Sequence, residues 1–155
     1  MIADALLNLS GSIAGNTVSG QAVFATSSTV LSTNTLDLGT ARDVGEGQPL
    51  FGRFEVTVAG VGGTSVEMQV IAADAAALTG NVTVIGTTGA IPLASLTLGS
   101  RFVASINPRL AKIGQRYFGF QYVNVGAMSA CSVFADVGLE IQDGQKYAAN
   151  GFAVL

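Results

Sequence analysis

Short stretches in which apolar and polar residues alternate recur along the chain, and glycine-rich turns separate them. The clearest of these stretches is Leu50–Val58. In a strand, Phe54, Val56 and Val58 would share one face, because side chains alternate between the two faces with a period of two. No long amphipathic helical pattern occurs in the 155 residues, so the sequence predicts an all-β protein.

The alternating stretches also predict how the strands are arranged. Leu50–Val58 and Val66–Val70 are separated by the flexible segment Ala59–Ser65, a pattern typical of a long hairpin with one solvated face. Residues 115–125 and 127–141 alternate as well. With about eight such strands, the expected architecture is an antiparallel two-sheet β-sandwich of jelly-roll type.

The length of the chain is sufficient for one hydrophobic core. We expect a single domain over residues 21–155. The first twenty residues contain Leu6, Leu7 and Leu9, which would suit a short helix, but Gly11 and Gly15 interrupt it. Residues 1–20 are therefore predicted to form an N-terminal arm that orders against a neighbouring subunit.

Charged residues make up only 11% of the sequence, against about 25% in an average soluble protein, while 49% are hydrophobic. Such a chain either enters a membrane or buries much of its surface against partners. The uncharged runs Ala5–Leu36 and Ala75–Ser100 are rich in Ser, Thr and Gly, and lack the roughly 18 consecutive apolar residues of a membrane helix. Burial against protein partners is the better interpretation, and no membrane contact is expected.

The distribution of charge gives a weaker indication. The net charge of −3 argues against nucleic-acid binding. Residues 75–135 nevertheless contain four basic residues and no acidic ones: Arg101, Arg109, Lys112 and Arg116. This segment is either an ordinary solvated region or a polar contact surface that selects a docking partner. Cys131 is the only cysteine, which fits synthesis in a reducing cytosol, and we expect it to be buried as a small apolar residue.

Reactive groups for catalysis are scarce. The chain has no histidine, so it lacks the usual general base and the commonest zinc ligand. Glu55 and Glu67 are candidate paired carboxylates for a hydrolase, but we expect them to be solvated or ion-paired. Asp37, Asp43 and Glu46 could converge on calcium, although their spacing matches no EF-hand loop. The sequence therefore predicts no enzyme activity, no cofactor and no metal site.

Five blocks of sequence, taken together and in this order, resemble the jelly-roll cement, or decoration, proteins of short-tailed bacteriophage capsids. The blocks are the region around Asp4, Ser32–Gly39, Arg42–Leu50, Gln115–Tyr122 and Asp143–Tyr147. The resemblance covers nearly the whole chain. Its motifs are turns and strand edges and contain no catalytic groups. The resemblance therefore implies that the protein functions by adhesion.

This resemblance implies a homotrimer on the outer surface of an icosahedral phage head, at three-fold and quasi-three-fold positions. There it would clamp neighbouring copies of the major capsid protein and stabilise the mature shell, after synthesis in the cytoplasm of the bacterial host. The expected partners are the major capsid protein and further copies of the chain. The predicted contact residues are Arg42, Asp43, Glu46, Gln48, Arg109 and Lys112.

Three other functions stay open at this point. The first is a receptor- or glycan-binding β-sandwich, such as a fibre tip or lectin; the loops contain Gly, Thr and Ala in place of Trp or Tyr, which counts against it. The second is a small hydrolase that uses Glu55 and Glu67. The third is a head–tail joining or tail-tube protein, which would assemble as a ring or tube.

Overall fold

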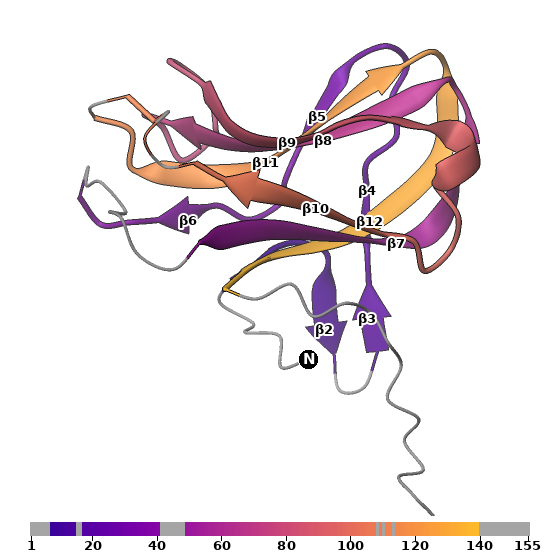
Figure 1. The fold of residues 1–155 in the computed structure, drawn as a ribbon, viewed down its shortest axis with the longest axis horizontal. Coiled ribbons are helices and arrows are strands. Elements are labelled where there is room, and N and C mark those ends of the chain that lie inside the picture. Colours follow the sequence, from indigo (N-terminus) through magenta and orange to yellow (C-terminus); the bar gives the residue numbers. More distant parts are fainter. Residues whose placement is uncertain are drawn as a thin grey trace, which may run out of the picture.

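The structure is a computed structural model that describes residues 7–14, 17–40, 49–107, 109, 111–112 and 114–139. Over these residues the chain forms two five-stranded sheets and a two-stranded ribbon, and all strand pairs are antiparallel (Figure 1). The two larger sheets face each other as layers. The predicted antiparallel β-sandwich is confirmed.

Each of the two layers contains strands from both halves of the chain. Sheet I has the order β1 (Asn8–Ser10), β12 (Met128–Gly138), β7 (Leu50–Gly62) and β10 (Arg101–Ile106), and β4 (Gln21–Ala22) also pairs with β12. Sheet II has the order β5 (Thr29–Leu31), β11 (Tyr117–Val125), β8 (Ser65–Ala73) and β9 (Thr83–Pro92), and β6 (Leu36–Asp37) also pairs with β11.

The pairs of strands are nested along the chain. β8 pairs with β9, β7 pairs with β10 outside them, β5 and β6 pair with β11, and β1 and β4 pair with β12. The chain therefore passes back and forth between the two sheets. Its first and last described strands, β1 and β12, are neighbours in sheet I.

The predicted hairpin between residues 50–58 and 66–70 is wrong. β7 pairs with β12 and β10 in sheet I, whereas β8 pairs with β11 and β9 in sheet II. Between them the chain crosses from one layer to the other through Gly62 and Gly63, both at φ +72°, a left-handed conformation that glycine adopts at little cost. A short glycine-rich turn suits this crossing as well as it suits a hairpin.

The predicted face of β7 is correct only in part. Phe54 and Val56 lie in the core at 1% and 0% exposure, but Val58 is 47% exposed. The pairing with β12 shifts by one residue here, since Val133 faces Val56 and the preceding Ser132 faces Val58. This β-bulge turns Val58 to the outer face of sheet I.

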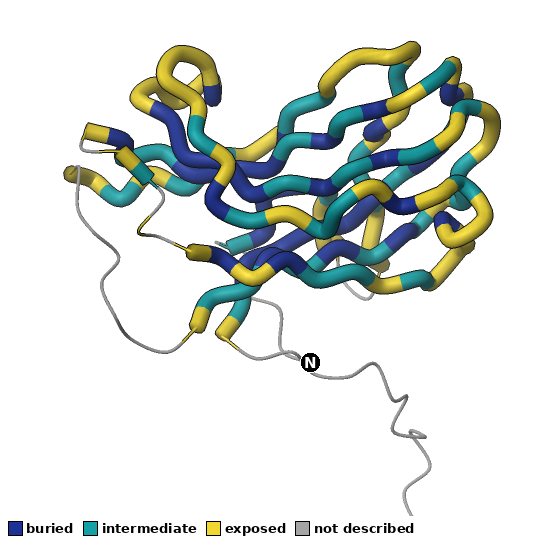
Figure 2. The backbone as a smooth tube through the Cα atoms, turned by 45° about the horizontal axis from the view of Figure 1, so that its top comes forward, coloured by how far each residue is buried: buried dark blue, intermediate teal, exposed yellow. Residues whose placement is uncertain are grey.

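The main core lies between the two sheets, where Figure 2 shows buried segments facing one another. Phe54 of sheet I packs edge-on against Phe120 of sheet II, with ring centroids 4.8 Å apart. Tyr122 and Cys131 are also fully buried, so the prediction for Cys131 is confirmed.

A second, smaller cluster lies on the outer face of sheet II. The loop 74–82 places Leu78 over Ile71 and Ala73, and these three residues are almost fully buried. Leu78 also packs on Gly119 of β11, so closely that a Cβ at Gly119 would overlap the Leu78 side chain. The loop 74–82 therefore covers part of the outer face of this sheet.

The N-terminal segment contributes to the sandwich and also extends from it. Leu9 of β1 belongs to the main core, and the hydroxyl of Tyr122 donates to Ser10 Oγ at 2.7 Å. After β1 the chain forms the ribbon of β2 (Ser12–Ala14) and β3 (Thr17–Ser19), which projects below sheet I in Figure 1. The division of the chain at residue 20 stays a prediction.

Two further features complete the fold. A 3₁₀ turn, η1 (Leu93–Ser95), follows β9. β12 ends at Gly138, within the alternating stretch 127–141, and residues 140–155 lie outside the described residues. No helix in the described part of the chain has the length and apolar character needed to cross a membrane.

Candidate interaction surfaces

Four of the six predicted contact residues, Arg42, Asp43, Glu46 and Gln48, lie outside the described residues. Arg109 and Lys112 are exposed between β10 and β11. The backbone N–H of Lys112 donates to Gln115 Oε1 at 2.8 Å, and the buried Gln115 amide donates to the Asn81 carbonyl. This segment is therefore anchored next to the loop 74–82.

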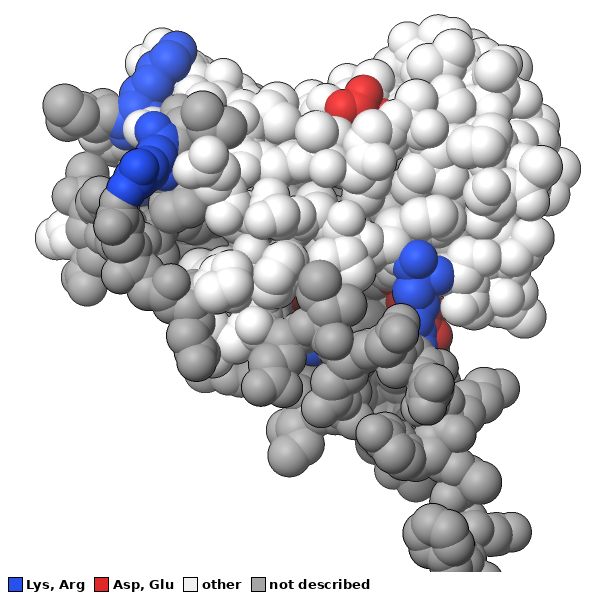
Figure 3. Space-filling model, viewed as in Figure 1, with Lys and Arg blue, Asp and Glu red and all other residues white. Residues whose placement is uncertain are grey.

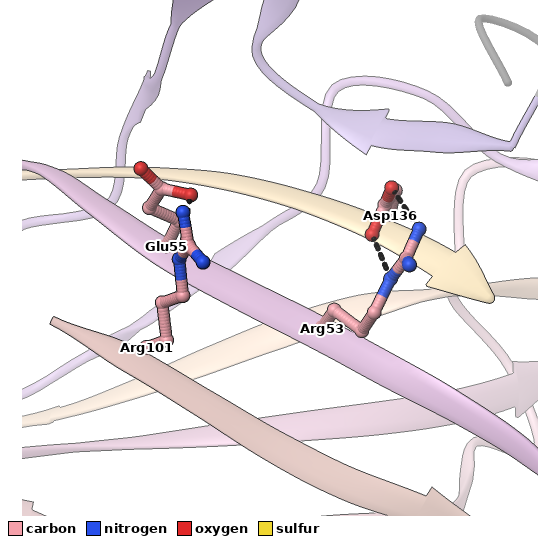
Figure 4. Close-up of polar contacts among 4 residues, drawn as sticks. All are labelled: Arg53, Glu55, Arg101 and Asp136. Carbon is pink, nitrogen blue, oxygen red and sulfur yellow. Dashed lines mark hydrogen bonds and ion pairs between the residues drawn. The ribbon is translucent and has the colours of Figure 1, made fainter. Parts of the chain in front are cut away.

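Two ion pairs lie on the outer face of sheet I, and their side chains are drawn in Figure 4. Arg53 of β7 makes a bidentate pair with Asp136 of β12: Nε donates to Oδ1 at 2.8 Å and Nη2 to Oδ2 at 2.5 Å. The Asp136 side chain is only 2% exposed. Beside it, Arg101 Nε donates to Glu55 Oε2 at 3.1 Å in a much more exposed pair. Together the four charges sum to zero.

Glu55 and Glu67, the candidate pair for a hydrolase, lie on opposite sides of the sandwich. Glu55 is on the outer face of sheet I, beside Arg101, whereas Glu67 belongs to β8 in sheet II. Glu67 Oε1 accepts hydrogen bonds from Gln69 and Thr87, which lower the pKa of its carboxyl below the usual value. The two carboxylates cannot flank one cleft, because the core separates them.

Another charged group lies where β6 meets β11. Arg116 Nη2 donates to Asp37 Oδ2 at 2.6 Å, and the guanidinium lies 4.7 Å from the ring centroid of Tyr117. The Arg116 hydrogen bond, followed by that of the Gly39 N–H, lowers the pKa of Asp37, and Asp37 in turn raises the pKa of Arg116. Arg116 is therefore an ion-pair residue at the rim of sheet II.

Asp43 and Glu46, the other two proposed calcium ligands, lie outside the described residues. Asp37 itself is engaged by Arg116. Within the part of the chain that the structure describes, no three His, Cys, Asp or Glu side chains are grouped as metal ligands would be.

One end of the sandwich has no charged residue among those described. Here the turn between β7 and β8 meets the turn between β11 and β12, since the Thr64 N–H donates to the Val125 carbonyl at 2.7 Å. Thr64 also accepts from the Leu93 N–H of η1, and the Ser27 N–H donates to the Gly126 carbonyl. In Figure 3 this end is the uniformly white right-hand edge, and the nearest visible charged side chains lie to its left.

An exposed apolar patch extends from this end over the outer face of sheet I. Its large members are Phe24, Val58 and Val61, which are 41%, 47% and 53% exposed. Ser132 faces both Ala22 and Val58 across β12, and Ala130 faces Val61. Val23 is fully buried, so the next side chain, Phe24, is on the outer side. We call these six residues the sheet I patch: Ala22, Phe24, Val58, Val61, Ala130 and Ser132.

The ribbon formed by β2 and β3 is the second exposed apolar element. All six of its strand residues are exposed. Ile13 and Val18 face each other across the ribbon and are 39% and 47% exposed. An isolated two-stranded hairpin is at best marginally stable in water, so this ribbon needs a surface to pack on.

Sequence reasoning missed both the patch and the projecting ribbon. A signal for them was present: the uncharged runs that argue against a membrane helix contain Ile13, Val18 and Phe24. Which of these side chains stay exposed depends on the bulge in β7 and on the course of the chain between β1 and β4. Neither can be read from alternation.

Comparison with known proteins identifies a family. The family model described as Bbp16 matches residues 17–137, which is most of the chain and nearly all of the sandwich. No curated protein matches the chain. The protein belongs to the Bbp16 family.

Proposed function

We propose that the protein is a structural component of a bacteriophage virion, a cement protein that binds the outer surface of the capsid. In this role it holds neighbouring copies of the major capsid protein together and stabilises the mature shell. The resemblance of the five sequence blocks implies this function, and the Bbp16 family name suggests a phage-related protein.

The main structural support for the proposal is the uncharged end of the sandwich together with the sheet I patch. Charged residues are depleted in the centres of protein–protein interfaces, where apolar side chains are buried. A surface on which Phe24, Val58 and Val61 are exposed and which contains no charged residue of its own has the composition of such a centre.

The nested strand pairs support the jelly-roll topology that the resemblance implies. When β1 and β4 are counted as one segment, and β5 and β6 as another, the two sheets contain eight segments. The first segment pairs with the last, and each inner pair lies within the next. This is the arrangement expected of a jelly roll. The trimer implied by the resemblance is the oligomeric state that we propose.

A cement protein of this kind binds several capsid subunits at once. Expansion of the shell during genome packaging would create its docking surface, so the oligomer would bind the mature lattice and not the precursor. Because each oligomer makes several linked contacts, release is slow even when a single contact is weak.

The experiment is a capsid-binding assay. Purified chain is mixed with expanded shells that lack it, and with unexpanded shells, and the bound fraction is measured after sedimentation. We expect saturable binding to expanded shells and little to unexpanded ones. A chain that stays in the supernatant with both would disprove the proposal.

The predicted contact loop is tested in the same assay. Substitution of both Arg42→Ala and Asp43→Ala is expected to weaken binding without lowering the free energy of unfolding. Glu67→Gln, on the outer face of sheet II, is the control and should bind as the unmodified chain does. If the loop variant occupies shells normally, these residues are not the contact.

A further inference from the structure

The sheet I patch and the projecting ribbon lie next to each other in one chain. Residues 11 and 20, at the root of the ribbon, lie over β12: a Cβ at Gly11 would be 3.2 Å from Phe134 Cδ2, and one at Gly20 would be 3.0 Å from the Val133 backbone. Ser132 of the patch is the next residue along β12. The ribbon therefore leaves the sandwich at the border of the patch.

We propose that the ribbon of one copy packs on the sheet I patch of a second copy, with Ile13 and Val18 against Phe24, Val58 and Val61. This contact rests on the self-association in the proposed function and not on capsid binding. It gives the ribbon a surface that the described part of its own chain does not provide, and it covers the patch.

The chemistry of the two elements matches. Neither contains a charged side chain among its described residues, so their contact removes apolar area from water without desolvating an ion. Each chain has one ribbon and one patch. In a closed homo-oligomer every ribbon can therefore pack on the patch of another copy, and no ribbon or patch is left uncovered.

The charges that border the patch also favour an identical partner. Arg53, Asp136, Glu55 and Arg101 neutralise one another within the chain. Two copies of this face can therefore approach without like-charge repulsion, which would oppose self-association on a face of one sign.

Disulfide trapping tests the contact directly. In a Cys131→Ala background, Val18→Cys and Val61→Cys are made as two separate proteins, and each has a single thiol. When the two are mixed and oxidised, we expect linked pairs that contain one chain of each. Each protein oxidised alone should give at most one tenth as many links.

A mass measurement supplies the second readout. Ile13→Ser with Val18→Ser should reduce the mass in solution to that of one chain, 15.7 kDa, with the unfolding midpoint little changed. The matched control is Val82→Ser with Val84→Ser, which alters two valines of similar exposure, 39% and 38%, at the start of β9. The control should keep the mass of the unmodified oligomer.

The outcomes separate this inference from the proposed function. If the unmodified chain is a single molecule in solution, both the ribbon contact and the proposed self-association are wrong. If it is an oligomer but the mixed cysteine proteins do not link, or if Val18→Cys links to itself, the ribbon contact alone is wrong. Loss of capsid binding with normal linking contradicts only the cement function.

Discussion

Arg53 and Asp136, which are 83 residues apart in the sequence, form a bidentate ion pair between β7 and β12 on the outer face of sheet I. Asp136→Ala would leave the Arg53 guanidinium, whose side chain is only 17% exposed, without its partner. We expect a loss of about 3 kcal/mol in the free energy of unfolding, measured by urea titration. Glu55→Ala, which breaks the neighbouring exposed pair, is the control and should cost less than about 1 kcal/mol. If both variants lost the same free energy of unfolding, burial of the Arg53–Asp136 pair would not be what makes it the stronger of the two.

The hydrogen bond between Tyr122 and Ser10 joins the N-terminal strand to the core of sheet II. Both residues are fully buried, so Ser10→Ala leaves the phenolic hydroxyl without its acceptor and should cost about 1–3 kcal/mol. Tyr122→Phe should cost about 1 kcal/mol. Because each change removes the same bond, we expect the double variant to lose clearly less than the sum. Strict additivity would mean that β1 is not held by this bond.

Leu78 and Gly119 test how the loop 74–82 is held on sheet II. Gly119→Ala should destabilise the protein by about 1–3 kcal/mol, because the new methyl group would overlap the Leu78 side chain. Leu78→Ala removes a buried side chain and should cost about 2 kcal/mol. In the double variant the smaller side chain at 78 leaves room for the new methyl group. Urea titration should therefore give a total below the sum of the two single losses, and a total equal to the sum would exclude the overlap as the cause.

Alkaline pH should destabilise the protein through two buried groups. Burial raises the pKa of the Cys131 thiol to about 11 from 9.0, and burial also raises the pKa of Tyr122. The unfolded chain loses these protons first, so the contribution of these two groups to the free energy of unfolding is constant below about pH 9 and falls as the pH rises towards 11. From Cys131 alone the fall approaches about 2 kcal/mol. The Cys131→Ala variant should lose less stability over this range, as measured by urea titration at each pH. An identical decline in both proteins would exclude the thiol as its source.

The reactivity of Cys131 provides a separate test. The buried thiol should react with an alkylating reagent at pH 8 only as fast as the protein unfolds. The control moves the thiol two residues along the same strand, with Cys131→Ala and Ser129→Cys, to an exposed position. It should react at least 100-fold faster. Similar rates would show that Cys131 is accessible in the folded protein.

Because alternation directly reflects which side chains face a core, the sequence was sufficient to predict the long strands of the sandwich and the class of fold, but not β1, β2 and β3. Phe118, Phe120 and Tyr122 lie on the buried face of β11, and Cys131 is in the core. The sequence was not sufficient to predict which strands pair. β7 and β8 alternate and are joined by glycines, but those glycines carry the chain from sheet I to sheet II.

The candidate surfaces were harder to predict, since they depend on contacts between distant segments. Val58 follows the pattern of Phe54 and Val56, and only its pairing with Ser132 shows that a bulge turns it outward. Phe134 is on the outer side of β12 but is 5% exposed, because the root of the ribbon covers it. The contacts proposed for residues 42–48 stay predictions.

The nested strand order has a consequence for how the protein is made. β1 finds its neighbour in β12, more than 110 residues later, so sheet I stays incomplete on the ribosome until almost all of the described chain has been synthesised. Native pairings over such long separations make folding slow and leave apolar strands open to aggregation in the meantime. The unfinished chains would therefore depend on chaperones to keep them apart until β12 has been made.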